Sequence, residues 1–176
     1  MKFKFILLLS IVFPFSINAQ SETSSPVPVD EEGIIRYVEV PQQEGSAKDL
    51  FKRCIKWING AYKNPASVTP TRDMEDKKIV VRHQFQLEST NADGVKVKGG
   101  LVMYDMTIRF RDGRYRIEMT DFKLKSISGT PAEDWLPNGS SPNPDNLKQL
   151  NDFATAKIES LKEGMKPEKE YEEEEW

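Results

Sequence analysis

The chain has 176 residues, of which 38% are hydrophobic and 30% charged, and its formal net charge is −3 at pH 7 with the single histidine neutral. This length is typical of one domain, and a single cysteine, Cys54, excludes an intramolecular disulfide. Six glutamates lie within residues 166–176, so the rest of the chain is almost neutral, whereas nucleic-acid-binding domains normally carry a net positive charge. We therefore expect no nucleic-acid partner.

The stretch from residue 1 to Ala19 has the pattern of a secretory signal peptide. Lys2 and Lys4 precede an apolar run of about eleven residues, which is too short for a membrane-spanning helix of about twenty. Ala19 suits the position before cleavage, so we expect an exported chain, periplasmic or secreted, that begins at Gln20 and has no transmembrane segment. A lipid anchor requires a cysteine directly after the signal, and the position of Cys54 therefore predicts none.

Residues 20–32 begin with Ser, Thr and Pro and few apolar side chains, and they predict a disordered leader. A single α+β domain is expected over residues 33–165, followed by an acidic tail over residues 166–176. Within the domain, β-branched and aromatic side chains at positions 34–40 predict a first strand, which Pro41 ends.

An amphipathic helix is predicted after Ser46. Its apolar side chains recur at spacings of three and four: Leu50, Phe51, Cys54, Ile55, Ile58, Ala61 and Tyr62. Ser46 and Asp49 have the spacing of a capping box, with Asp in place of Glu, and Asn64-Pro65 ends the segment. Cys54 lies within the apolar stripe, so we expect a buried thiol rather than a nucleophile.

Further strands are predicted after this helix. Residues 77–88 alternate between apolar and polar side chains, which places His83 on the apolar face of a half-buried strand. We expect this histidine to be a core residue rather than a general base. A turn leads to a long strand over residues 95–111, with a bulge where Gly99-Gly100 interrupts it.

A two-residue hairpin turn is the sharpest local signal. Asp112-Gly113 supplies two positive φ angles at low cost between two alternating segments. The turn sets the register, and three opposed pairs on one face are then apolar: Phe110 with Tyr115, Ile108 with Ile117, and Met106 with Met119. After Thr120 the alternation shifts, which predicts a bulge near Asp121.

The same register opposes like charges on the outer face of the hairpin. Arg109 lies opposite Arg116, and Arg111 lies opposite Arg114, an arrangement that normally lowers stability. One interpretation is a cationic strip, joined by Arg82, that binds an anionic ligand such as a glycan acid, a phosphate or a lipid head group.

The other interpretation of these arginines is a solvated face, in which they pair with neighbouring carboxylates. Glu118, Asp105 and Asp112 are the candidate partners. A mixed charged face of this kind keeps an exposed sheet soluble.

Residues 126–143 are rich in Gly, Pro, Ser and Asn and form a long connection, where functional residues often lie. Trp135 in this loop either stacks on a ligand, as a further candidate binding residue, or packs under the domain and pins the loop. Asn143-Pro144 then predicts the start of a final helix. Its apolar residues have helical spacing: Leu147, Leu150, Ala154, Ile158, Leu161 and Met165.

The predicted order is strand, helix, three antiparallel strands, loop and helix. Packing both amphipathic helices on the apolar face of one sheet would bury every apolar stripe at once. The expected fold class is therefore α+β, with an antiparallel sheet of about four to five strands and two helices on one face.

Three segments carry a resemblance to a known family. They are residues 37–41, residues 50–53 together with Trp57, and residues 112–116 followed by residues 121–122. On these segments the chain resembles the exported Bacteroidota proteins catalogued as domain of unknown function 4468, with a TBP-like fold. The resemblance implies a TBP-like sheet with helices on one side, and no known activity or catalytic residues. Likeness to a DNA-binding saddle is by itself no argument for function.

Enzymatic interpretations lack the residues that they need. One histidine and one cysteine cannot form a zinc site, and the chain has neither a redox cysteine pair nor a phosphate-binding glycine loop. We therefore expect no cofactor, no metal and no catalytic activity. A carboxylate pair among Asp105, Glu118 and Asp121 is the one hydrolase alternative.

The sequence thus favours a non-catalytic binding or interaction module of the bacterial cell envelope, with an envelope protein or an anionic ligand as its partner. The alternative is a structural or assembly protein that acts through an edge strand or through the acidic tail. In the tail, Tyr171 and Trp176 lie among glutamates, as in a short docking motif or a solubilising segment.

Overall fold

The structure is a computed structural model that describes residues 25–167. The expected signal peptide, residues 20–24 of the expected leader and residues 168–176 of the expected tail lie outside the described residues. None of the helices within the described range combines the length and the apolarity needed to cross a membrane.

The described residues form a five-stranded antiparallel sheet with the order β1-β5-β4-β3-β2. The strands are β1 (Tyr37–Glu39), β2 (Thr71–Asp73), β3 (Lys78–Thr90), β4 (Lys96–Arg111) and β5 (Arg114–Leu124). The long helices are α1 (Ala47–Ala61) and α3 (Pro144–Gly164), and the short ones are α2 (Pro65–Val68) and the 3-10 helix η1 (Ala132–Trp135). The expected α+β class, with four to five strands and two main helices, is confirmed.

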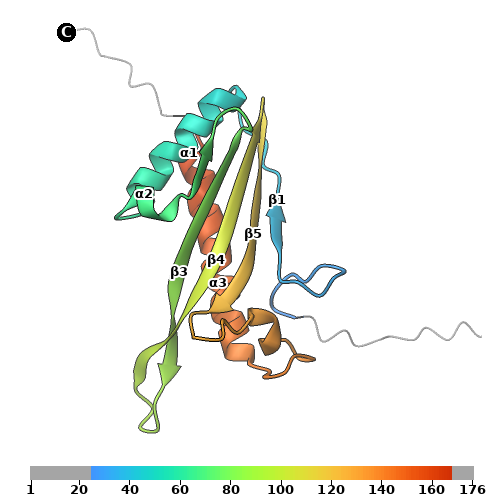
Figure 1. Ribbon diagram of the computed structural model, residues 1–176, viewed down its shortest axis with the longest axis vertical. Coiled ribbons are helices and arrows are strands. Elements are labelled where there is room, and N and C mark those ends of the chain that lie inside the picture. Colours follow the sequence, from blue (N-terminus) through green and yellow to red (C-terminus); the bar gives the residue numbers. More distant parts are fainter. Residues whose placement is uncertain (1–24, 168–176) are drawn as a thin grey trace, which may run out of the picture.

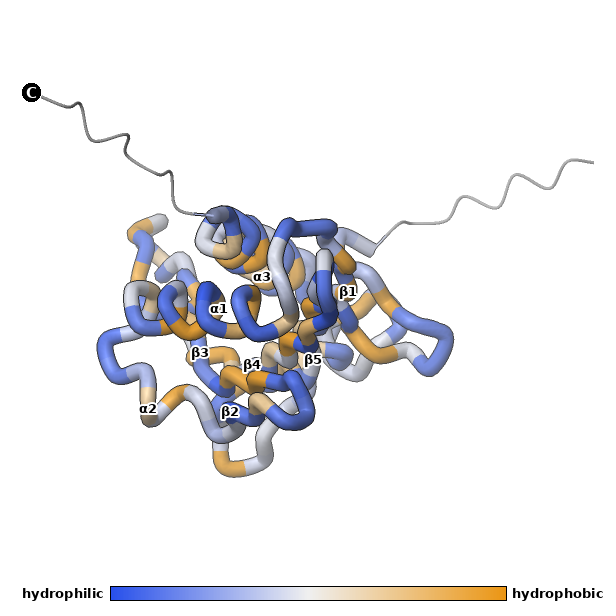
Figure 2. The backbone as a smooth tube through the Cα atoms, turned by 90° about the horizontal axis from the view of Figure 1, so that it is seen from above, coloured by the Kyte–Doolittle hydropathy of each residue, from blue (hydrophilic) through white to orange (hydrophobic). Residues whose placement is uncertain are grey.

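α1 and α3 pack on one face of the sheet (Figures 1 and 2). The strand residues beneath them are fully buried, as at Ile79, Ile108 and Ile117, and they meet Leu50 of α1 and Leu150 of α3 in one hydrophobic core. The side chains that alternate with these residues along the strands point to the opposite face, called the open face below. The arginines of the β4–β5 hairpin lie there, because alternation places them opposite the buried positions.

The capping box at the start of α1 is confirmed. Ser46 Oγ accepts a hydrogen bond from Asp49 N at 3.2 Å, and Asp49 Oδ2 accepts one from Ser46 N at 3.2 Å. The predicted end of the helix at Asn64-Pro65 is wrong, because α1 ends at Ala61. Asn64 instead caps α2, and the following proline occupies the first turn, where its missing N–H costs nothing.

The two edge strands differ most from the prediction. β1 has three residues, fewer than the predicted span of 34–40. The sequence pattern does not predict β2, whose Thr-Arg-Asp side chains lack apolar alternation. Only its pairing with β3, with Thr71 opposite Val80, makes this segment a strand.

Both predicted bulges are confirmed. The register between β3 and β4 shifts where Gly99-Gly100 lies, and a Cβ on Gly99 would be 3.2 Å from the carbonyl oxygen of Leu87. The register between β4 and β5 shifts at Asp121, whose φ of 59° lies in the left-handed region.

Part of the expected leader is folded. Val27 is 4% exposed and belongs to the hydrophobic core, and Val29 forms an isolated bridge with the segment that enters β1. Asp30 Oδ1 accepts a hydrogen bond from Ile34 N at 2.9 Å, which closes a turn at Gly33. The expectation of disorder is therefore wrong for residues 25–32, because their few apolar side chains find a place in the core that composition does not reveal.

Candidate functional site

The β4–β5 hairpin brings four arginines together on the open face. The predicted register is confirmed, with Arg109 opposite Arg116 and Arg111 opposite Arg114. The prediction of two positive φ angles in the turn is wrong, because Gly113 has a φ of 74° but the φ of Asp112 is not positive. All four residues are exposed, and we call them the arginine strip. Opposed Cβ atoms in an antiparallel pair lie about 5 Å apart, and the next residue on the same face lies about 7 Å along the strand, so the four side chains leave one small patch.

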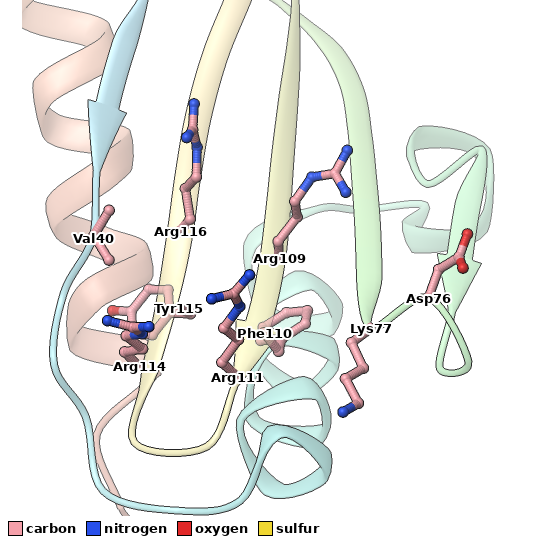
Figure 3. A pocket seen from close by; sticks show the side chains of 9 residues that line it. All are labelled: Val40, Asp76, Lys77, Arg109, Phe110, Arg111, Arg114, Tyr115 and Arg116. Atoms are coloured by element: carbon pink, nitrogen blue, oxygen red, sulfur yellow. The ribbon is translucent and has the colours of Figure 1, made fainter.

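The arginine strip lines a hollow of about 510 Å³. Val40, which follows β1, borders the hollow on one side, and Asp76 and Lys77 border it on the other (Figure 3). The carbonyl oxygen of Lys77 accepts a hydrogen bond from Phe110 N at 2.9 Å, which joins the turn before β3 to β4. The hollow thus lies between the two edges of the sheet, with a fifth cation at its rim.

Sequence reasoning missed the residues at the rim of this hollow. Asp76 and Lys77 lie in the turn between β2 and β3, and β2 itself has no pattern that predicts it. Lys77 also has a φ of 50°, a backbone conformation that is uncommon for residues other than glycine and that the sequence does not predict. Nothing in the sequence therefore places this turn beside the hairpin arginines.

Three residues of the arginine strip have no carboxylate partner among residues 25–167. Within the described residues, no ion pair involves Arg109, Arg111 or Arg114. Asp112, which the sequence offers as a partner, instead accepts a hydrogen bond from Ala47 N at 2.7 Å. A carboxylate is favourable at this position, because it faces the unpaired N–H groups at the start of α1. The hairpin turn is thus bound to the helix, and its carboxylate does not neutralise the strip.

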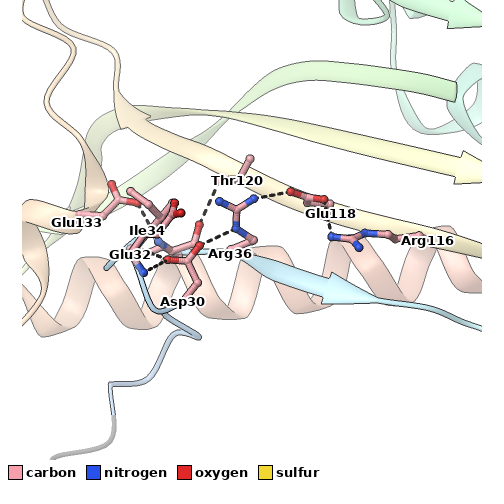
Figure 4. Close-up of polar contacts among 9 residues, drawn as sticks. Asp30, Glu32, Ile34, Arg36, Arg116, Glu118, Thr120 and Glu133 are labelled. Carbon is pink, nitrogen blue, oxygen red and sulfur yellow. Dashed lines mark hydrogen bonds and ion pairs between the residues drawn. The ribbon is translucent and has the colours of Figure 1, made fainter.

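The fourth arginine shares a carboxylate with a cation from the N-terminal segment (Figure 4). Arg116 Nη2 lies 2.9 Å from one oxygen of Glu118, and Arg36 Nη1 lies 2.6 Å from the other. Asp30 holds Arg36 in turn, at 2.7 Å. Burial raises the pKa of Glu118, but the hydrogen bonds from the two arginines lower it by more, so this pKa lies below its ordinary value. The carboxylate pairing expected of a solvated face is therefore present at Arg116, with Glu118, and at Arg82, with Asp105, and among the described residues it is not formed at Arg109, Arg111 or Arg114.

Arg82 does not join the arginine strip. Its Nε and Nη2 lie 2.7 and 2.6 Å from the two carboxylate oxygens of Asp105, and this hydrogen bonding raises the pKa of Arg82. Nor does Arg82 line the hollow. The guanidinium of Arg82 is bonded to Asp105 of the neighbouring strand β4 and lies outside the hollow. Arg82 is therefore not grouped with the other candidate binding residues.

Trp135 lies in the hydrophobic core rather than beside the arginine strip. Its side chain is 5% exposed, and its neighbours Ala132 and Leu136 are also buried. The carbonyl oxygen of Trp135 accepts a hydrogen bond from Asn143 N at 2.9 Å, which ties the loop to the start of α3. A buried ring cannot stack on a ligand, so the structure favours the pinning interpretation.

The carboxylates considered for a hydrolase are each paired with cations. Asp105 binds Arg82, Glu118 binds two arginines, and Asp121 lies 2.9 Å from Lys123. Within residues 25–167, no group of three His, Cys, Asp or Glu side chains gathers where it could hold a metal ion. The structure therefore offers the hydrolase alternative no unpaired carboxylate among these three.

Cys54 in α1 and His83 in β3 both lie on the helix-covered side of the sheet. Cys54 is fully buried, as expected, and burial raises the pKa of its thiol. His83 packs against Tyr62 and Tyr104, with ring centroids 5.1 and 6.4 Å away, and burial lowers its pKa. Neither side chain lines the hollow on the open face.

The lowered pKa of His83 predicts a pH dependence of stability. Below about pH 6.5 the unfolded chain binds a proton more readily than the folded chain does, so the free energy of unfolding should fall as the pH decreases and should level off above that value. His83→Phe keeps a ring beside the tyrosines and should flatten this part of the profile, since the chain has no other histidine. Urea unfolding between about pH 5 and 8 measures it; an equal slope in both proteins would contradict the assignment.

The arginine strip has the chemistry of a site for oxyanions. Each guanidinium presents a planar fork of N–H donors that matches the oxygens of a carboxylate or a phosphate. Three such groups have no ion pair in the described part of the chain, and with a fourth that shares its carboxylate they leave donors for two adjacent anionic groups.

Three comparisons with known proteins bear on this fold. The family model described as "Domain of unknown function (DUF4468) with TBP-like fold" matches residues 37–125, from β1 to just beyond β5. No curated protein matches the chain. A crystal structure of a TBP-like protein from Parabacteroides distasonis is similar with a TM-score of 0.62 and 19% identity, covering 80% of this chain and 97% of that one. A DUF4468 family protein from Bacteroides ovatus is similar with a TM-score of 0.64 and 15% identity, covering 83% and 94%. At these identities, the likeness to solved structures shows the fold alone.

Proposed function

The chain belongs to the DUF4468 family, a domain of unknown function with a TBP-like fold, and from that premise we propose that it is a non-catalytic binding module of the bacterial cell envelope whose arginine strip binds an acidic glycan. The export signal expected in residues 1–19 supports the location. The ligand is a chain that carries carboxylate or phosphate groups at neighbouring positions.

The observation that carries this proposal is the set of unpaired arginines in register. Arg109, Arg111 and Arg114 line one hollow without an ion pair among the described residues. Opposing like charges across two strands lowers stability, and no contact within the described residues offsets that loss at Arg111 and Arg114. A local conflict of this kind is typical of a functional site, where a ligand supplies the missing counter-charge.

The shape of the hollow favours a glycan chain over a membrane surface. Val40 and Lys77 border it on its two sides, so the strip lies in a hollow of the size of a few sugar units rather than on a flat surface. An extended acidic chain can lie across β4 and β5 in this hollow and place successive anionic groups on successive arginines.

The proposal of a non-catalytic role is supported by the surroundings of the groups most often used in catalysis. Cys54 lies on the core-facing side of α1 and His83 on the sheet face that the helices cover, with pKa shifts that favour the neutral thiol and the neutral imidazole. The hollow itself is lined by cations, with Asp76 as its one carboxylate.

The test is a binding measurement on the chain that begins at Gln20, which keeps every described residue. Fluorescently labelled oligogalacturonate is titrated with this protein at low salt, and phosphatidylglycerol vesicles form a separate arm. We expect Arg111→Gln/Arg114→Gln to weaken oligogalacturonate binding about tenfold or more, because two charge-assisted contacts are lost. Thermal unfolding should be unchanged or shifted upward, because the opposed charges are removed.

Two control variants separate the strip from general electrostatics. Lys63→Gln/Lys98→Gln removes the same charge from exposed positions outside the hollow and should change the affinity by no more than about twofold. Arg111→Lys/Arg114→Lys keeps the charge and should still bind more weakly, because lysine lacks the planar fork. Equal loss in the Lys63/Lys98 control, or no binding of the oligosaccharide at low salt, would contradict the proposal. Binding to vesicles alone would assign the strip to a membrane surface instead.

A further inference from the structure

The arginine strip is complementary in charge to a segment of the same chain. Residues 168–176 contain six glutamates and one lysine, and they follow Pro167, the last described residue. We propose that residues 168–176 occupy the arginine strip of their own chain and compete there with the external anionic ligand. This inference rests on the proposed function in that both concern the same strip.

The end of α3 lies at the same end of the molecule as the β4–β5 turn (Figure 1). Arg53 Nη1 donates hydrogen bonds to the carbonyl oxygens of Glu44, at 2.7 Å, and of Met165, at 3.2 Å. Gly113 in the turn donates its N–H to the carbonyl oxygen of Gly45, at 2.9 Å. Arg53 thus joins the end of α3 to residue 44, and the adjacent residue 45 is bonded to the hairpin turn beside the strip.

The segment is long enough to reach the open face. Nine extended residues span up to about 30 Å, which exceeds the combined depth of a helix layer and a sheet layer, about 20 Å. A short tether also holds the segment at an effective concentration of about millimolar, so weak individual contacts are sufficient for occupancy. The contact should be strongest at low ionic strength, because exposed charges are screened by salt.

A second place for the segment is the groove between α1 and α3, which Pro167 itself lines. The cations that line that groove are Arg53, Lys56 and Lys166, and none of the three is without a partner. Arg53 donates to two backbone carbonyl oxygens, and Lys166 pairs with Glu163. The arginine strip is the better acceptor of a glutamate-rich segment, because three of its guanidinium groups have no ion pair within the described range.

A spin label on the segment tests its position directly. Trp176→Cys in the chain that begins at Gln20 accepts a nitroxide, and Cys54 does not compete because it is fully buried. At low salt we expect selective broadening of the backbone amide signals between residues 109 and 116. Replacing the six glutamates with glutamine, as the matched control, should abolish that broadening. Broadening confined to Trp57 and Ser160 would place the segment in the groove and would overturn the inference. The absence of any selective broadening would overturn it too.

Competition provides the second readout. A chain that ends at Pro167 should bind oligogalacturonate about three- to tenfold more tightly than the longer chain, and the glutamine-substituted chain should match the shortened one. If none of these proteins binds oligogalacturonate, the proposed function fails while the spin label still decides the position of the segment. If all bind equally and no broadening occurs, the inference fails while the proposed function stands.

Discussion

Trp135→Ala is expected to lower the free energy of unfolding by about 3–5 kcal/mol, the usual loss when a buried tryptophan is truncated. The ring is 5% exposed in the core, and the surrounding loop has other buried anchors at Ala132 and Leu136. Deletion of the ring leaves a cavity beneath the loop and removes the contacts that hold it against α3. This loss is large beside the usual stability of a domain, about 5–15 kcal/mol.

Urea unfolding of the chain that begins at Gln20 measures this effect. Ile127→Ala is the matched control, because Ile127 lies in the same loop and is fully exposed, so its removal should leave stability within about 0.5 kcal/mol. Trp135→Phe should lose less than the alanine variant, because it keeps a ring in the cavity. A Trp135→Ala protein of normal stability that no longer binds oligogalacturonate would restore the ligand-stacking interpretation.

Gly164→Ala is expected to destabilise the fold by about 1–3 kcal/mol, although alanine is the better helix former. A Cβ at position 164 would lie 2.5 Å from Cδ1 and 2.9 Å from Cβ of Trp57. Trp57 cannot easily move aside, because it is buried and its Nε1 donates a hydrogen bond to Ser160 Oγ at 3.1 Å. The close approach of α1 and α3 therefore requires glycine at this position.

Gly60→Ala is the matched control for this prediction. Gly60 also lies in a helix, α1, but a Cβ there would meet no atom within 4 Å. The same substitution should therefore raise the free energy of unfolding, by up to about 1 kcal/mol. Thermal and urea unfolding of the two variants measure both signs. If the two substitutions raised the free energy of unfolding equally, the contact between Gly164 and Trp57 would be less close than the structure shows.

The arginine strip was predictable because its geometry is local. Asp112-Gly113 sets a two-residue turn, and every opposed pair between β4 and β5 up to the bulge at Asp121 follows from that turn. The strand period of two then places the arginines on one face and the core residues on the other. No long-range information is needed for either step.

The partners of these arginines were not predictable in the same way. Asp112 is adjacent to Arg111 in sequence but accepts its hydrogen bond from Ala47, at the start of a distant helix. Arg36 reaches Glu118 only because β1 pairs with β5. Which carboxylate neutralises which arginine depends on these long-range pairings, so the sequence left both interpretations of the strip open.

By itself the sequence determined the α+β class, the capping box of α1, the hairpin register, both bulges and the burial of Cys54. These features depend on side-chain period, turn chemistry and hydrophobicity, which act over a few neighbouring residues. Only the tertiary structure decided that residues 25–32 are folded, that β2 exists, that Trp135 is buried and that three arginines have no ion pair within residues 25–167. Those features depend on which distant segments meet, and pairing between segments far apart in the chain leaves no periodic signal in either one.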